Sequence, residues 1–168
     1  MLASGRLLWF VRHGAIAIRC SNPVLRAMLL PRSLSLRQRG SGSVDFIGVI
    51  IEESLERKDV LKKVKIVKTK VENVTEKHKT PWIKKWTLHT IEIPANRADA
   101  IAKELSESLD SQHSWYADFK NGSMHYIIFR GKIFKVDRTK KEQYDEVTRY
   151  GVSLGIPCYQ LDFSPDIE

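Results

Sequence analysis

Asp118 and His125 are the residues whose types and spacing most directly suggest chemistry, because they flank a tight turn. Asn121-Gly122 lies between two apolar segments, and Asn-Gly favours a two-residue hairpin turn. In that hairpin Asp118 faces His125, and Tyr116 faces Ile127, on the less apolar side of the sheet. A carboxylate beside an imidazole can orient a general base. The pair can equally be a surface contact worth less than about 1 kcal/mol, and we expect this structural role.

A lysine-rich stretch that contains two tryptophans is the second candidate site. Residues 57–85 carry eleven lysine or arginine residues and three acidic ones. Lysines beside exposed aromatic rings can follow a phosphate backbone and stack bases. The alternative is a solvated edge strand on which lysines prevent aggregation, with the tryptophans packed in the core. The candidate binding residues are Lys68, Lys70, Lys84, Lys85, Trp82 and Trp86.

Neither a metal nor a cofactor is expected from the motifs. No His-x3-His or Cys-x2-Cys pair occurs, and these spacings usually mark zinc sites. No GxGxxG or GxxxxGK[ST] loop occurs, so the standard nucleotide fingerprints are absent. Cys158 has no identifiable base to activate it. Cys20 and Cys158 cannot build a disulfide framework, which fits a reducing cytoplasm.

The elements that must position these residues alternate between strands and two helices. Apolar alternation predicts strands at 46–51, 64–74, 86–93, 114–119, 124–130, 133–136 and 159–163. Apolar residues at helical spacing predict helices at 96–109 and 139–154. We expect an α+β domain whose mostly antiparallel sheet carries both helices on one face. The order resembles a ferredoxin-like split β-α-β unit with an N-terminal β extension.

The first 43 residues differ in composition from the rest of the chain. They contain seven arginines, no lysine and no acidic residue, whereas residues 44–168 contain 21 basic and 20 acidic residues. The segment can be a transit peptide, a basic arm that touches phosphates, or sequence upstream of the true start. The change in basic-residue usage favours the last. We expect a disordered or non-native extension at 1–43 and a single α+β domain at 44–168.

Several segments of the second part resemble a group of short, uncharacterised bacterial and archaeal proteins. The motifs that carry the resemblance are FIGVIIEESL, HKTPW, WTLHTIEIP, WYADFKNG, HYIIFRGKIFKVDR and SLGIP, within residues 44–164. The resemblance implies a prokaryotic protein that begins near residue 44. It implies no activity, cofactor or catalytic residue.

We therefore expect a small non-enzymatic binding or accessory module of the cytoplasm. No run of eighteen apolar residues occurs, so no membrane-spanning helix is expected. A nucleic acid or a protein is the expected partner, and a second copy of the chain paired through an exposed strand is a further option. The alternatives are a nucleic-acid-binding module and a small enzyme that uses Asp118, His125 and Tyr116.

Overall fold

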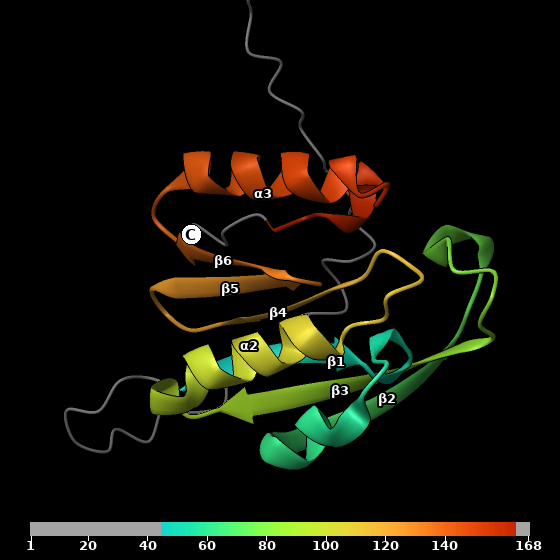
Figure 1. The fold of residues 1–168 in the computed structure, drawn as a ribbon, viewed down its shortest axis with the longest axis horizontal. Helices are drawn as coiled ribbons and strands as arrows, with labels where there is room; N and C mark the ends of the chain where they lie inside the picture. Colours follow the sequence, from blue (N-terminus) through green and yellow to red (C-terminus); the bar gives the residue numbers. More distant parts are fainter. Residues whose placement is uncertain (1–44, 164–168) are drawn as a thin grey trace, which may run out of the picture.

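The computed structural model describes residues 45–163, which form one six-stranded antiparallel sheet and two main helices (Figure 1). The strand order is β2-β3-β1-β4-β5-β6. The α+β class with a mostly antiparallel sheet is thereby confirmed, whereas residues 1–43 lie outside the described part of the chain. The strands are β1 (Phe46–Ile51), β2 (Lys65–Asn73), β3 (Lys85–Ile93), β4 (Tyr116–Lys120), β5 (Met124–Phe129) and β6 (Lys132–Asp137); the helices are α2 (Ala98–Ser108) and α3 (Lys141–Ser153).

A split β-α-β unit forms the centre of the sheet. β1 pairs antiparallel with β3 on one side and with β4 on the other, so β3 and β4 run parallel. Helix α2 connects these two parallel strands across β1. The helix buries a stripe of Ile101, Ala102 and Leu105 against the sheet, as its apolar spacing predicts.

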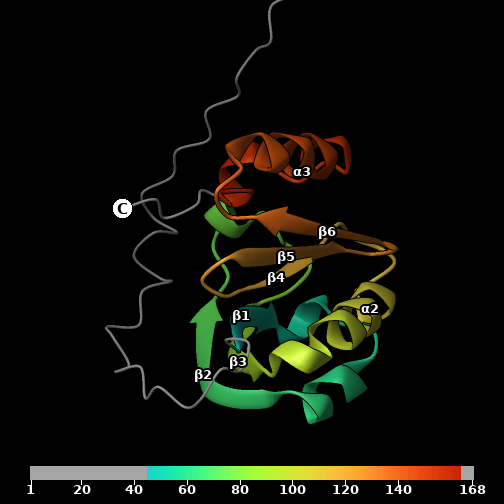
Figure 2. The same ribbon diagram turned by 90° about the vertical axis from the view of Figure 1, so that its left-hand side faces the viewer.

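The two helices cover opposite faces of the sheet, and the expectation that they share one face is wrong. Side chains alternate along β5, so Tyr126 and Ile128 project to one face and Ile127 and Phe129 to the other. The first pair belongs to the hydrophobic cluster under α2, the second to the cluster under α3. Figure 2 shows α2 and α3 on different sides of β5 and β6. The arrangement therefore departs from the ferredoxin-like pattern, because α3 covers the face of the sheet opposite α2.

The hairpin between β4 and β5 has a longer loop than the Asn-Gly signal predicts. Lys120 pairs with His125, so Asp118 lies opposite Ile127 instead of opposite His125. The side chain of Asn121 accepts hydrogen bonds from the N–H groups of Ser123 and Met124, which closes the wider turn. The register differs by two residues, and a shift of two leaves every side chain on its predicted face.

The end of the described chain does not form the predicted strand at 159–163. Cys158–Gln160 is a short 3-10 helix, and Leu161 and Phe163 are buried in the cluster under α3. Gly151 of α3 allows this approach, because a Cβ there would lie 2.7 Å from a methyl group of Leu161. The segment thus fills the space between α3 and the sheet without joining the sheet.

Candidate binding site

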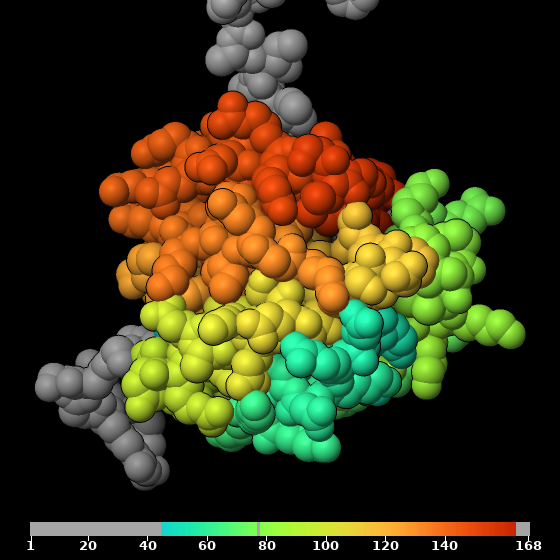
Figure 3. All heavy atoms as spheres, in the orientation of Figure 1, coloured from blue at the N-terminus to red at the C-terminus, as the bar shows by residue number. Residues whose placement is uncertain are grey.

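The loop that joins β2 to β3 stands out from the body of the molecule. Figure 3 shows it in green at the right-hand edge, against the gold residues that precede β4. Thr75 N–H donates to Nδ1 of His78 at 2.9 Å, and Lys79 ends this turn in the left-handed region at φ 55°. The Gln160 side chain donates to the carbonyl of His78 at 2.8 Å. The loop is therefore fixed to the C-terminal segment, far away in sequence.

A cluster of aromatic rings lies at the base of this loop. The rings of Trp82 and His113 are stacked, with 4.0 Å between their centroids and an angle of 11° between their planes. Trp115 meets Trp82 edge-on at 6.4 Å and Trp86 at 5.9 Å. Trp115 is 8% exposed, whereas Trp82 is 48% exposed. The inner rings thus hold an outer indole in a fixed orientation at the surface.

Asp110 fixes the imidazole under that indole. Nδ1 of His113 lies 2.6 Å from Oδ2 of Asp110, and the N–H of Gln112 donates to Oδ1 at 2.9 Å. Burial raises the pKa of Asp110, but hydrogen bonds from the Gln112 N–H and from His113 hold that pKa below its usual value. The carboxylate therefore stays ionised at neutral pH and keeps the imidazole in place.

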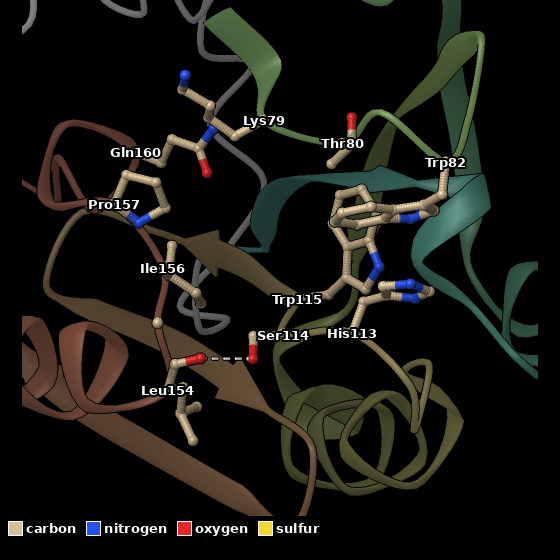
Figure 4. A pocket seen from close by; sticks show the side chains of 11 residues that line it. Lys79, Thr80, Trp82, His113, Ser114, Trp115, Leu154, Ile156, Pro157 and Gln160 are labelled. Atoms are coloured by element: carbon tan, nitrogen blue, oxygen red, sulfur yellow. Dashed lines mark hydrogen bonds between the residues drawn. The ribbon is translucent and has the colours of Figure 1, made fainter. Parts of the chain in front are cut away.

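A pocket of about 310 Å³ opens beside the ring cluster (Figure 4). Trp82, His113 and Trp115 form one side, and Ile156 and Pro157 from the segment after α3 form the opposite side. The pocket combines flat aromatic walls with a few polar groups, which suits a flat ligand with a polar edge. The polar lining groups are Lys79, Thr80, Ser114 and Gln160.

The structure brings only some of the predicted lysine-site residues to this pocket. Trp82 lines it, and the exposed Lys84 and Lys85 follow in the same connection and at the start of β3. Trp86 instead turns inward and is half-buried, with Nε1–H donating to Oγ1 of Thr80 at 3.1 Å. The prediction of one surface that includes both tryptophans is therefore wrong in this respect.

Lys68 and Lys70 lie farther along the outermost strand β2. Both are exposed, and Lys70 forms an ion pair with Glu72. At about 3.4 Å per residue, Lys68 is roughly 17 Å along the strand from Asn73, which pairs with Lys85. These two lysines can contact a long ligand that also occupies the pocket, but they do not line it.

The Asp118–His125 pair exists but lies beneath a helix. Nε2 of His125 is 3.0 Å from Oδ2 of Asp118, and Nδ1 is 3.2 Å from the hydroxyl of Tyr144 on α3. His125 is only 4% exposed. The prediction that this side of the hairpin is the less buried one is wrong, because α3 covers it. An imidazole with both nitrogens engaged and no access to solvent cannot serve a substrate in this conformation.

Tyr116, the third candidate catalytic residue, is also committed to the fold. Its hydroxyl donates to the carbonyl of Gln160 at 2.6 Å. Burial, together with the nearby charges of Asp118 and Asp162, raises the pKa of Tyr116. The phenol therefore stays protonated and acts as a structural donor.

Across residues 45–163, no group of three His, Cys, Asp or Glu side chains is placed to hold a metal ion.

Comparisons with known proteins add no relative to this picture: no family model, curated protein or solved structure matches the chain. Among the helices at 45–163, none has the length and apolar character needed to cross a membrane. The site residues that the sequence reasoning missed are Asp110, His113 and Gln160, whereas Lys79 belongs to the predicted lysine-rich stretch. The Asp-x-x-His spacing in a short polar loop was the one available signal, since a carboxylate can bond its own loop two or three residues onward.

Proposed function

We propose that this protein is a binding module for single-stranded nucleic acid, with one base stacked at Trp82. The observation that carries the proposal is the half-exposed indole, held by a parallel imidazole at the mouth of a pocket. Base stacking on an aromatic side chain contributes about 1–3 kcal/mol per base. A rigid ring loses little freedom on binding, so more of that energy appears as affinity.

Charge around the indole supports an anionic ligand. Residues 77–85 contain four lysines and no acidic residue. Lys79 lines the pocket, while Lys84 and Lys85 are exposed near it. Phosphate contacts from such lysines release counterions, so binding weakens steeply as salt rises.

A single strand fits this site better than a duplex. In a duplex the faces of the bases are covered by their neighbours, and only their edges are available in the grooves. The indole of Trp82 offers a flat ring surface, which only an unstacked base can use. The lysines of β2 then provide a path for the backbone away from the pocket.

The test is a fluorescence-anisotropy titration of the full chain with labelled single-stranded and duplex oligonucleotides at low and near-physiological salt. Trp82→Ala should weaken single-strand binding by about tenfold, which corresponds to the loss of roughly 1.4 kcal/mol of stacking. Trp82→Phe should retain part of the affinity. The arginine-rich first 43 residues remain constant in this comparison, so their contribution cancels.

A matched control separates the pocket from general attraction by positive charge. Lys103→Ala removes an exposed lysine of α2, on a different part of the molecule, and should leave the affinity unchanged. Lys84→Ala with Lys85→Ala should lower both the affinity and the salt dependence. Equal affinity of wild type and Trp82→Ala for every single strand would refute the proposal.

A further inference from the structure

A second histidine of the sheet lies between a threonine and a glutamate, away from the pocket. Nδ1 of His89 on β3 is 2.9 Å from Oγ1 of Thr69 on β2. Nε2 of His89 is 3.0 Å from Oε2 of Glu52, in the 3-10 helix that follows β1. Hydroxyl, imidazole and carboxylate thus form a continuous hydrogen-bonded series across three elements.

The series has the order that nucleophilic catalysis requires. With its proton on Nε2, His89 donates to the carboxylate of Glu52 and leaves Nδ1 to accept from the hydroxyl of Thr69. A nucleophile within hydrogen-bond reach of a base, which a third group orients, is the geometric signature of an activated hydroxyl. The imidazole is 8% exposed, whereas Thr69 lies exposed on the outermost strand. The base is therefore shielded and the hydroxyl is accessible.

Lys58 keeps the carboxylate end of the series ionised. Its Nζ lies 2.7 Å from Oε1 of Glu52, the oxygen that His89 does not use. Hydrogen bonds from Lys58 and from His89 lower the pKa of Glu52. An ionised carboxylate with one oxygen fixed in this way can stabilise the imidazolium that forms when the hydroxyl loses its proton.

Backbone donors lie beside the same hydroxyl. The N–H of Val74 bonds to the carbonyl of Lys84, so the even-numbered residues of β2 direct their N–H groups toward β3. The register is regular from Asn73 to Lys68, so the N–H groups of Thr69 and Val71 point away from β3, at the edge of the sheet that residues 45–163 leave unpaired. A carbonyl oxygen that lies at this edge can accept from the N–H of Thr69 while its carbon is next to Oγ1 of the same residue.

We propose that Thr69, His89 and Glu52 form an acyl-transfer site for carboxylic esters at the open edge of β2. Oγ1 of Thr69 bonds to the ester carbonyl carbon, and its proton passes to Nδ1 of His89. The bond from that carbon to the leaving alkoxide then breaks, and His89 returns the proton to release an alcohol. Water, deprotonated by His89, attacks the acyl-threonine, which releases the carboxylic acid and restores the hydroxyl.

His125 makes a useful comparison within the same sheet. It is also hydrogen-bonded through both nitrogens, but its partners are a carboxylate and a phenol beneath α3. That series ends in Tyr144, which is 5% exposed, so neither end offers an accessible nucleophile like Thr69. The two hydrogen-bonded series thus differ in the exposure of their hydroxyl groups: that of Thr69 is exposed and that of Tyr144 is buried. Of the two, the His89 series is therefore the one that can meet a substrate.

The test is covalent labelling of the full chain with a fluorophosphonate, followed by intact-mass measurement and peptide mapping. The Thr69 oxygen bonds to phosphorus, fluoride leaves, and the hydroxyl proton passes to His89. Thr69→Val should abolish the adduct in the β2 peptide, and Thr69→Ser should retain it. His89→Gln and Glu52→Gln should slow labelling by about 100-fold or more, the range expected for loss of a general base.

Thr90→Val is the matched control. Thr90 is also a threonine, but it pairs with Lys68, so its side chain projects to the face of the sheet opposite that of Thr69. It should label at the wild-type rate. Thermal melts of each variant establish folding, and Thr69 is exposed enough for Thr69→Val to fold. No adduct on wild type, an adduct only outside the β2 peptide, or equal rates for wild type and His89→Gln would overturn the proposal. Hydrolysis of p-nitrophenyl acetate should show the same ranking.

Discussion

Gly48 offers the sharpest test of how the sheet is packed. It lies within β1, opposite Ile91 of β3 and Phe119 of β4. A Cβ at this position would lie 2.2 Å from the carbonyl oxygen of Asp118 and 2.5 Å from Cβ of Phe119. These atoms belong to the backbone or are attached to it directly, so no side-chain rotation can relieve the contact.

The magnitude follows from the distance. Ordinary contact begins at 3.4 Å, so β4 must move by about 1.2 Å to accept a methyl group at Gly48. Overpacking costs typically about 1–3 kcal/mol and more where the backbone must shift. We expect Gly48→Ala to lower the free energy of unfolding by about 3 kcal/mol, which is a large fraction of a typical total of about 5–15 kcal/mol. The midpoint of thermal unfolding should fall by about 10 °C.

Two other glycines provide a graded control. No atom lies within 4 Å of a Cβ at Gly122, so Gly122→Ala should be close to neutral. At Gly151 the nearest atom is 2.7 Å away, but it belongs to the flexible end of the Leu161 side chain. Alanine there gains about 1 kcal/mol of helix propensity, which offsets the displacement. Urea unfolding followed by tryptophan fluorescence measures all three variants. A Gly48→Ala variant within 1 kcal/mol of wild type would refute the reasoning.

Three further variants test the polar contacts. Tyr144→Phe removes the hydroxyl next to buried His125 and should cost about 1–3 kcal/mol in urea unfolding, because an imidazole nitrogen loses its partner. The pKa of Asp110 is lowered in the folded state, so its ionised form adds stability above its unfolded pKa of about 4, and that stability is lost as pH falls through the folded pKa. Asp110→Asn should therefore lose less stability than wild type when thermal melts are compared from pH 5 down to pH 2. Trp86→Phe should cost about 1–2 kcal/mol in the same urea assay, since it leaves Thr80 without its indole donor.

The sequence predicted the elements well where local patterns decide them. The strand at 46–51 agrees with β1 at both ends. The apolar spacing at 139–154 predicts a buried stripe of Tyr144, Val147, Gly151 and Leu154; the first three are buried, but Leu154, just after α3, is 38% exposed. The positive φ of Gly155 follows α3, as its place after the apolar stripe predicts. Such features depend on residues close together in the chain, so sequence alone can specify them.

The faces of the sheet were harder to predict, because they depend on contacts between distant segments. The sequence of β5 nevertheless indicates which faces are covered. The residues from His125 to Phe129 (HYIIF) do not alternate between polar and apolar, and all five are buried. A run of apolar residues without alternation is typical of a strand covered on both sides. Applied to this hairpin, that rule predicts a helix above His125 and excludes a solvent-exposed Asp118–His125 pair.

The candidate sites likewise combine residues that a local pattern identifies with residues that only contacts between distant segments bring together. Trp82 was identified from its lysine neighbours, but the ring beneath it comes from His113, more than thirty residues later. Likewise Thr69 and His89 are joined only by the register of β2 and β3. No spacing rule connects such residues, since the turn length and the bulge near Val67 decide which side chains meet.

The position of β5 between two hydrophobic clusters has a consequence for hydrogen exchange. Its alternate residues belong to both clusters, so its amides can exchange only when both helices have separated from the sheet. The outermost strand β2 is exposed along almost its whole length and can open without disturbing either cluster. We expect β5 amides to report the global unfolding free energy and β2 amides to exchange through local opening. The edge that carries Thr69 would thus sample open conformations while the rest of the fold stays intact.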